Sequence, residues 1–465
     1  MEIRIITKNR GKMTGIWQAF LMILKVFFDW LKQNWMLLPE IVIAIAAFAL
    51  AYRSFEHEKE EIRKNLFKLA DHILAGNYAE LSRRAGKFYS AQFDQENDDN
   101  LIVEHLIYKK ECWIDDFAQG LRKIDSIKIN YDPDRVLANG NPMPEKLFQS
   151  KLKRILPDPD FSLVENSLMY LDKSIWDHPT FMVKQVVEGT AQDEDSPNVL
   201  GIDVYLDGYY DFYNTCLGLG YLESFESVKK KRRSSVNAVR AKLPLQDYSN
   251  RYCTLGIVTL TVVKGLVGGT KFLLHSRSTQ VAEGRGLINA VPAGSLQPSS
   301  TPDKLTKSDI SQAVKLNIIR ETGEELFGHD EFTDCFSTET IETNTLARIM
   351  ADKLFYLGVG INPLNTYLEM LTLSVIDVND SETQAFITSG IGNGKAQKEI
   401  LDSADFMESL RKNEEGDISI RDFNKPTLES YADMYNAAPA FAQIAKILSE
   451  NFDLIDDFIE NRARS

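Results

Sequence analysis

Two apolar segments open the chain and set its first structural expectation. The second, residues 35–52, carries one charge, Glu40, and a helix of that length spans a bilayer at about 1.5 Å per residue. The first, residues 15–31, has polar positions at helical spacing. They fall on one stripe of a helix: Gln18, Lys25, Asp29 and Lys32. No small-residue cleavage site follows this segment, so a cleavable signal peptide is a poor fit.

The charges around these segments decide between one membrane span and two. Basic residues outnumber acids before residue 15, which predicts a cytoplasmic N-terminus. A hairpin that turns near 33–34 returns the body to the cytoplasm and brings Lys25 and Glu40 to similar depths, where an ion pair lowers the cost of burial. We therefore expect a transmembrane helical hairpin over 1–53, in the inner cell membrane. A buried amphipathic core helix is the alternative.

The polar side chains of this hairpin suggest partners. Intramembrane charges are functional candidates, and the stripe equally suits contact with another subunit. Its members are Gln18, Lys25, Asp29 and Glu40. The expected partners are membrane lipid and further copies of this chain in a homo-oligomer.

Three further regions follow the apolar segments. Residues 54–125 are rich in Glu, Lys, Leu and Ala at helical spacing, which predicts a helical linker. Residues 126–249 contain turn-rich stretches and predict an extension that packs on the next domain. Residues 250–450 predict the main domain with C-terminal helices. The basic run 229–233 is typical of a solvated loop, although a nuclear signal or lipid-binding patch has the same composition.

Composition narrows the function classes. The chain is 44% hydrophobic and 26% charged, as in ordinary globular proteins. Its formal net charge of -14 excludes a general binder of nucleic-acid polymers, because such a protein needs a basic surface. The four cysteines lie far apart without a CxxC pair, which gives no zinc site, no dense disulfide framework and no recognisable nucleophile motif.

The most informative pattern begins after Cys253. Residues 254–278 form two β-rich segments around a Gly-Gly turn, which is typical of a hairpin. A stretch punctuated by Gly and Pro, 284–296, precedes an amphipathic helix with Ser308 as N-cap and Gly328 as its end. The segments FYLGVGIN and YLEMLTLSVIDV predict two more strands. The main domain is therefore expected to be of the α+β class.

The helix of this domain carries candidate metal ligands. Glu321, Glu324 and Glu325 are spaced i, i+3 and i+4, so their carboxylates share one face and repel one another by a few tenths of a kcal/mol per pair. Hard oxygen ligands of this kind suit Mg²⁺ or Mn²⁺, which bridges to the phosphates of a nucleotide. Arg320 is placed to orient a carboxylate by a bidentate contact. A surface helix with a chance acidic cluster is the simpler alternative.

The order of strand hairpin, Gly/Pro loop and helix bearing R-E-x-x-E-E resembles the Nudix hydrolase family. The resemblance implies an α/β/α sandwich with a mixed sheet, a nucleotide ligand and a catalytic role for the three glutamates. It also makes Gly294 the loop glycine. Two positions depart from the family's pattern: Gln312 stands where the loop glutamate is expected, after an insertion of twelve residues, and Phe327 stands where a glycine is expected. The helix carboxylates still suit a metal ion, but efficient hydrolysis is in doubt.

Other residues of this domain suit contacts with a nucleotide ligand. His275 and Arg277 end a predicted strand and suit a phosphate, or a solvated edge. Glu369 suits a late base or an acceptor that reads a nucleobase. Aromatic residues on the later strands suit stacking on a base, although core packing is the commoner role: Phe355, Tyr356 and Tyr367.

An anchored Nudix-like domain resembles the membrane effectors that accompany nucleotide second-messenger cyclases in bacterial anti-phage (CBASS) operons. That resemblance implies a domain that senses a cyclic or other small nucleotide and helices that disrupt the membrane. The alternatives are a membrane-tethered, Mg²⁺-dependent pyrophosphohydrolase of nucleoside diphosphate derivatives, and a scaffold that binds nothing.

Overall fold

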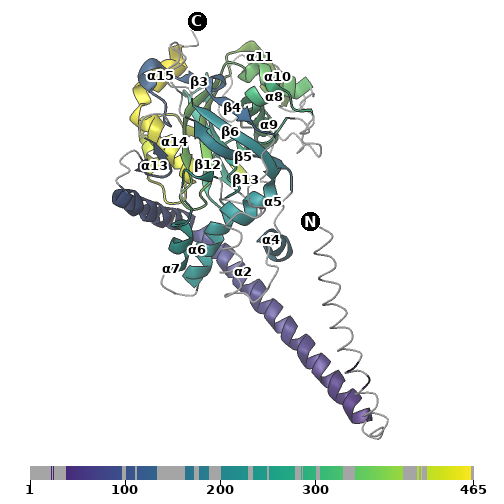
Figure 1. Ribbon diagram of the computed structural model, residues 1–465. Helices are drawn as coiled ribbons and strands as arrows, with labels where there is room; N and C mark the ends of the chain where they lie inside the picture. Colours follow the sequence, from purple (N-terminus) through teal and green to yellow (C-terminus); the bar gives the residue numbers. More distant parts are fainter. Residues whose placement is uncertain are drawn as a thin grey trace. The chain divides into compact units, whose positions relative to one another are not determined.

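The chain is represented by a computed structural model (Figure 1). It describes residues 22, 25, 38–96, 101–109, 113–133, 163–171, 177–187, 200–228, 234–243, 245–248, 251–277, 284, 286–299, 304–327, 341–390, 406–407, 410 and 416–461. Two compact units are distinguished, Met1–Asn65 and Leu66–Ser465. The core and both sites discussed below belong to the second unit.

Ten strands of the second unit form one mixed sheet, in the order β1-β2-β11-β12-β7-β8-β13. Three short strands lie off this path: β3 pairs with β11, β9 with β8 and β10 with β7. The bounds are β1 Leu101–Val103, β2 Ile107–Lys109, β3 Arg122–Lys123, β7 Leu255–Lys264, β8 Lys271–Arg277, β9 Ile288–Ala290, β10 Ala293–Ser295, β11 Leu354–Ile361, β12 Leu368–Asp377 and β13 Gly416–Asp422.

Strands β7 and β12 form the centre of this sheet. They pair in parallel along their whole length, from Leu368 opposite Leu255 to Asp377 opposite Lys264. All of β7 is buried, and so is β12 up to its last residue. Their near-continuous runs of Val, Ile, Leu and Thr are the composition expected of strands covered on both faces.

Helices cover both faces of the central strands. On one face, Ile318 of α9 shares a hydrophobic cluster with Ile257 and Met370. On the other face, Phe441 of α14 shares a cluster with Leu371 and its neighbours on β7. Alternation along each strand separates the two clusters, because successive side chains point to opposite faces. The remaining helices of this part surround these two. Their bounds are α8 Lys307–Ser311, α9 Ala313–Phe327, α10 Ile341–Met350, α11 Ser381–Gly390, α13 Lys425–Ala432, α14 Pro439–Glu450 and α15 Phe452–Asn461.

A second sheet of three strands, in the order β4-β6-β5, comes from the region predicted to be an extension. It joins the main sheet through backbone hydrogen bonds from Phe181 N to Leu296 O at 2.9 Å and from Val183 N to Cys253 O at 2.6 Å. The extension therefore packs on the main domain. Its elements are β4 Lys128–Tyr131, α4 Leu163–Leu171, β5 Pro179–Val187, β6 Gly201–Gly208, α5 Tyr209–Phe212, a π-helical turn Tyr213–Leu217, α6 Gly218–Val228 and α7 Ser234–Arg240.

The expected transmembrane hairpin over 1–53 is corrected. Among the described residues, no helix is both long and apolar enough to cross a membrane. Helix α2, Leu38–Glu96, is apolar only as far as Tyr52 before Arg53 and a strongly charged stretch begin, whereas a span needs about 20 consecutive apolar residues. Of the proposed stripe, Lys25 is exposed and Glu40 lies in the first turns of α2, while Gln18 and Asp29 fall outside the described residues.

The predicted helical linker, 54–125, is helical only to the end of α2 at Glu96. Strands β1, β2 and β3 follow and join the main sheet. The C-terminal half of α2 is part of the core, since Phe67, Leu81 and Tyr89 are almost fully buried. This segment is therefore a structural part of the body as well as a connection.

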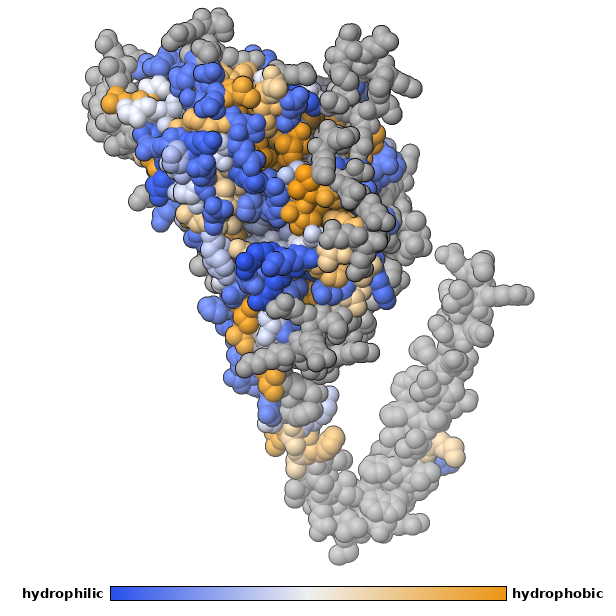
Figure 2. All heavy atoms as spheres, turned by 90° about the vertical axis from the view of Figure 1, so that its left-hand side faces the viewer, coloured by the Kyte–Doolittle hydropathy of each residue, from blue (hydrophilic) through white to orange (hydrophobic). Residues whose placement is uncertain are grey.

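Hydrophilic residues dominate the described part of the face turned to the viewer in Figure 2, and apolar residues appear there in small groups. Scattered exposed apolar residues are normal for a folded surface.

Two glycines with opposite surroundings test the packing of this fold. In β11, a Cβ at Gly358 would lie 2.6 Å from Ile114 Cδ1 and 3.0 Å from Trp113 O, so the neighbouring segment must shift. We expect Gly358→Ala to lower the free energy of unfolding by about 1–3 kcal/mol. In α2, a Cβ at Gly76, which directly precedes the kink at Asn77, meets nothing within 4 Å. We expect Gly76→Ala to raise the free energy of unfolding by about 0.5–1 kcal/mol. Urea denaturation of both variants measures the difference, and effects of the same sign would contradict this description.

Candidate functional site

Helix α9 is introduced by a short capped helix. Thr306 is the N-cap of α8, and its hydroxyl accepts from Asp309 N while the Asp309 carboxylate accepts from Thr306 N, which completes a capping box. The N-cap is therefore Thr306 and not the predicted Ser308. Gln312 is the C-cap of α8, and α9 follows directly and ends at Phe327. The predicted end of the helix, Gly328, lies outside the described residues.

The acidic side of α9 is turned toward β10 and the residues that follow it. Ala293 N donates to Glu325 Oε2 at 3.2 Å, and Gln297 N donates to Asn317 Oδ1 at 3.2 Å. Between these contacts, a Cβ at Gly294 would collide with the carboxylate of Glu321. A side chain at position 294 would displace the flexible end of Glu321, so glycine lets the strand and this carboxylate approach as they do here. We call Gly294, Arg320, Glu321, Glu324 and Glu325 the α9–β10 site.

Arg320 holds the carboxylates of this site together. Its Nη2 donates to Glu321 Oε1 at 2.6 Å, and its Nε lies 3.8 Å from Glu324 Oε1. The same guanidinium donates to Gln297 Oε1 at 2.9 Å and to Asn317 Oδ1 at 2.8 Å. A positive charge between two acidic side chains of one helix face offsets the repulsion that their spacing creates.

The side chains of the site are largely shielded from solvent. The exposed fractions are 9% for Arg320, 13% for Glu321 and 16% for Glu324, and Glu325 is buried. Three carboxylates beside a glycine backbone are the type of ligand that a hard divalent cation prefers. No group of three or more His, Cys, Asp or Glu side chains that could hold a metal is assembled among the described residues. A metal ion at this site would therefore have to share or replace the contacts of Arg320.

The site continues into the second sheet through residues that the sequence analysis missed. Gln297 Nε2 lies 2.8 Å from His178 Nε2, and the His178 ring stacks on Tyr209 with centroids 4.8 Å apart. Asn317 had a detectable signal, because it lies three residues before Arg320 on the same helix face. His178 had none, because it is far from α9 in the sequence and precedes a strand of another sheet.

Glu369 does not belong to this site. It lies on the face of β12 opposite to Met370, and a Cβ on the neighbouring Gly256 would be 3.6 Å from its Cγ. Its carboxylate accepts from Tyr367 Oη at 3.0 Å and from Asn362 Nδ2 at 3.3 Å. The expected late base is thus part of a buried polar network on the α14 side of the sheet.

Arg277 and His275 lie on β8, away from β10 along the chain. Arg277 pairs with Gly416 of β13, its backbone N–H donates to Leu287 O at 3.0 Å, and strand β9 separates this position from Gly294. His275 is buried and pairs with Ile418 of β13. Among the described strands, β8 pairs with β7, β9 and β13 and not with β10, the strand of the α9–β10 site.

The aromatic candidates on the later strands serve the core. Phe355 packs edge-on against Phe458 with ring centroids 5.2 Å apart, and Tyr356 Oη donates to Trp113 O at 2.8 Å. Tyr367 is buried and engaged with Glu369. Base stacking would require each of them to leave these contacts.

The described cysteines are poor nucleophiles. Burial raises the pKa of the Cys216 thiol and also that of Cys253, so both remain protonated at neutral pH. Both are free, and Cys112 and Cys335 lie outside the described residues.

The contacts of Arg320 predict its effect on stability. We expect Arg320→Met to lower the free energy of unfolding by about 3 kcal/mol at pH 7, because two shielded carboxylates lose their shared cation. Chemical denaturation at pH 7 measures this loss.

The matched control for this variant is Arg348→Met. Arg348 makes a 2.7 Å ion pair with Glu382 while 67% of its side chain is exposed, and such surface pairs contribute about 0–1 kcal/mol. Equal losses in the two variants would contradict the role given to Arg320.

Comparison with known proteins gives no independent assignment. No protein-family model matches the chain, and no curated protein matches its sequence. The geometry of the α9–β10 site is therefore the basis for any functional proposal.

Proposed function

We propose that the α9–β10 site binds a nucleotide through a divalent cation, Mg²⁺ or Mn²⁺. The observation that carries the proposal is the orientation of α9. Glu325 accepts from Ala293 N, and the carboxylate of Glu321 lies against Gly294, in the space that a Cβ there would enter. In a surface helix with a chance acidic cluster, we would expect the carboxylates to point into solvent.

Each residue has a defined part in the proposal. Glu321, Glu324 and Glu325 supply carboxylate oxygens to the cation, which when bound would bridge the protein to the phosphates of the ligand. Gly294 allows the strand backbone to approach these oxygens. Arg320 keeps the carboxylates in place when no cation is bound, through its contacts with Glu321 and Glu324.

Binding without efficient hydrolysis is favoured by Gln312. This residue is exposed at the junction of α8 and α9, and its Nε2 donates to Ser308 Oγ at 3.3 Å. An amide at this position cannot ionise, so it supplies neither a metal-binding carboxylate nor a general base. The proposal is therefore a nucleotide-binding, sensor-like domain, and a pyrophosphohydrolase is the competing outcome of the test.

The proposal does not include membrane disruption. That expectation depended on a helical hairpin across the bilayer, and no described helix is long and apolar enough for this purpose. What remains of the effector hypothesis is the binding of a small nucleotide.

Mn²⁺ binding tests the metal half of the proposal. We expect the full chain to bind Mn²⁺, detected by loss of the free-ion electron paramagnetic resonance signal. Glu324→Gln and Glu325→Gln should each weaken the affinity about tenfold or more, because each removes a charged oxygen ligand. The control Glu429→Gln removes an exposed carboxylate of α13 and should change nothing. Equal affinity in all four proteins would refute the site.

Nucleotide binding, the second part of the proposal, needs a separate measurement. Isothermal titration of the full chain with ADP-ribose and with a cyclic dinucleotide, with and without Mg²⁺, should show Mg²⁺-dependent binding of at least one of them. Chromatography of the same mixtures should show the nucleotide intact. Rapid, glutamate-dependent cleavage would establish the hydrolase instead, and no binding under any condition would leave only a scaffold.

A further inference from the structure

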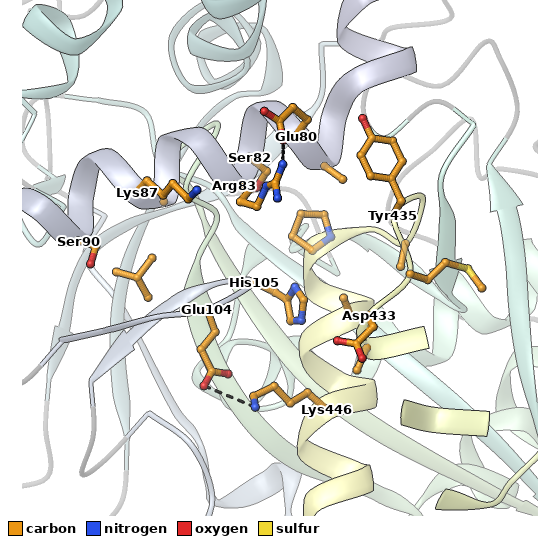
Figure 3. A pocket seen from close by; sticks show the side chains of 18 residues that line it. Glu80, Ser82, Arg83, Lys87, Ser90, Glu104, His105, Asp433, Tyr435 and Lys446 are labelled. Atoms are coloured by element: carbon orange, nitrogen blue, oxygen red, sulfur yellow. Dashed lines mark hydrogen bonds and ion pairs between the residues drawn. The ribbon is translucent and has the colours of Figure 1, made fainter. Parts of the chain in front are cut away.

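A cavity of about 630 Å³ lies on the α14 side of the large sheet, opposite to α9 (Figure 3). Three parts of the second unit line it: the C-terminal half of α2, the turn between β1 and β2, and the segment from the end of α13 into α14. Its volume is in the range of small-molecule sites, about 300–1,000 Å³. None of the residues of the α9–β10 site belongs to its lining.

Small side chains create this space. The α2 wall presents Ala79, Ser82, Gly86 and Ser90 at helical spacing. The facing wall presents Ala432, Ala437 and Ala442. These residues leave room between two walls that larger side chains would fill.

The α2 wall carries two basic side chains, Arg83 and Lys87, and one acidic side chain, Glu80. Arg83 and Lys87 are four residues apart on one helix face, where like charges repel, and both are exposed. Arg83 pairs with Glu80 of the same helix, which also receives Arg84 Nε at 2.5 Å. Lys87 has no ion pair within the described residues, so it is available to an anion.

The facing wall carries the acidic Asp433, the basic Lys446 and the polar Tyr435. Asp433 is the C-cap of α13, and only its backbone has a hydrogen bond among the described residues. Tyr435, which is 58% exposed, follows it on the same wall. In Figure 3, Lys87 and Asp433 lie on opposite sides of the cavity with His105 between them.

The remaining charged lining residues are already compensated. Glu104 lies 3.7 Å from Lys446 Nζ and accepts from Gln443 Nε2 at 3.2 Å, and Lys446 also donates to Glu450 at 2.6 Å. Burial lowers the pKa of His105 despite the opposing effect of Glu104, so its ring is neutral at pH 7. A neutral imidazole offers one donor and one acceptor to a ligand.

We propose that this cavity binds a small dipolar organic molecule, with its anionic end at Arg83 and Lys87 and its cationic or N–H-donating end at Asp433. Lys87 and Asp433, which have no ion pair within the described residues, select for polarity at both ends of the ligand, while the small residues between them select for its size. This site is independent of the nucleotide proposal, because its lining and its face of the sheet are different.

Three probes share the required polarity but differ in chemical source: L-glutamine, trialanine with free termini, and adenosine 5′-monophosphate. Isothermal titration of the full chain at pH 7.5 measures each of them. We expect at least one to bind, with affinity lowered about tenfold or more in both Lys87→Gln and Asp433→Asn, as for a lost hydrogen bond to a charged group. The exposed control Lys425→Gln should bind like the unaltered protein.

A capped ligand sharpens the test. If trialanine binds, its N-acetylated form should bind less tightly to the unaltered protein and should lose nothing more in Asp433→Asn, because the same contact is already gone. Failure of all three probes to bind, or binding that is indifferent to both substitutions, would overturn the proposal. Unchanged thermal unfolding of the two variants confirms that a loss of affinity is not a loss of fold.

Discussion

The parallel pairing of β7 with β12 is the constraint on which the rest of the structure depends. Both strands are buried on both faces, so each must be covered by a helix on either side. Helix α9 supplies one cover and α14 the other. The acidic face of α9 meets β10 because β10 pairs with β7, from Gly294 opposite Ile257, and so lies directly beside the central strands. The α9–β10 site is thus a consequence of how the sheet is covered.

Electrostatic balance decides what this site can do. Glu321 and Glu324 are shielded by the strand, which makes their repulsion more costly than on an open helix surface. Arg320 offsets that repulsion from within the same helix, at 2.6 Å from Glu321 and 3.8 Å from Glu324. A divalent cation carries a larger charge than the guanidinium of Arg320, so in the proposed complex it would take over part of this compensation. Arg320 therefore compensates these carboxylates within the protein itself, and the proposed cation would share that role.

The sequence predicted the central part of the fold because its elements carry strong local signals. The hairpin of β7 and β8 around a Gly-Gly turn and the helix α9 fall where alternation and periodicity place them. Strands β1 and β2 were missed, since strands of three residues are too short to show a period of two and they follow a long helical pattern. The contact of His178 with Gln297 was missed because nothing local records a pairing across 119 residues.

Glu369 shows a different limit of the same reasoning. Its place in β12 was predicted, but its function depended on which face of the strand α9 covers, and a shift of one position reverses the answer. Met370 faces α9, so Glu369 faces the other side, where Tyr367 and Asn362 hold it. Local patterns fix the alternation of a strand and leave open which set of side chains faces a given helix.

Helix α2 combines both kinds of error. Its first turns were assigned to a membrane because they are apolar, and its later turns to a linker because they are polar and periodic. No described helix is long and apolar enough to cross a membrane, while Phe67 and Tyr89 of the later turns are buried in the core. Helix α2 presents small and charged residues to the cavity opposite Asp433: Ala79, Glu80, Ser82, Arg83, Gly86, Lys87 and Ser90. The helical periodicity of this part of α2 therefore places core residues on one face and cavity-lining residues on another.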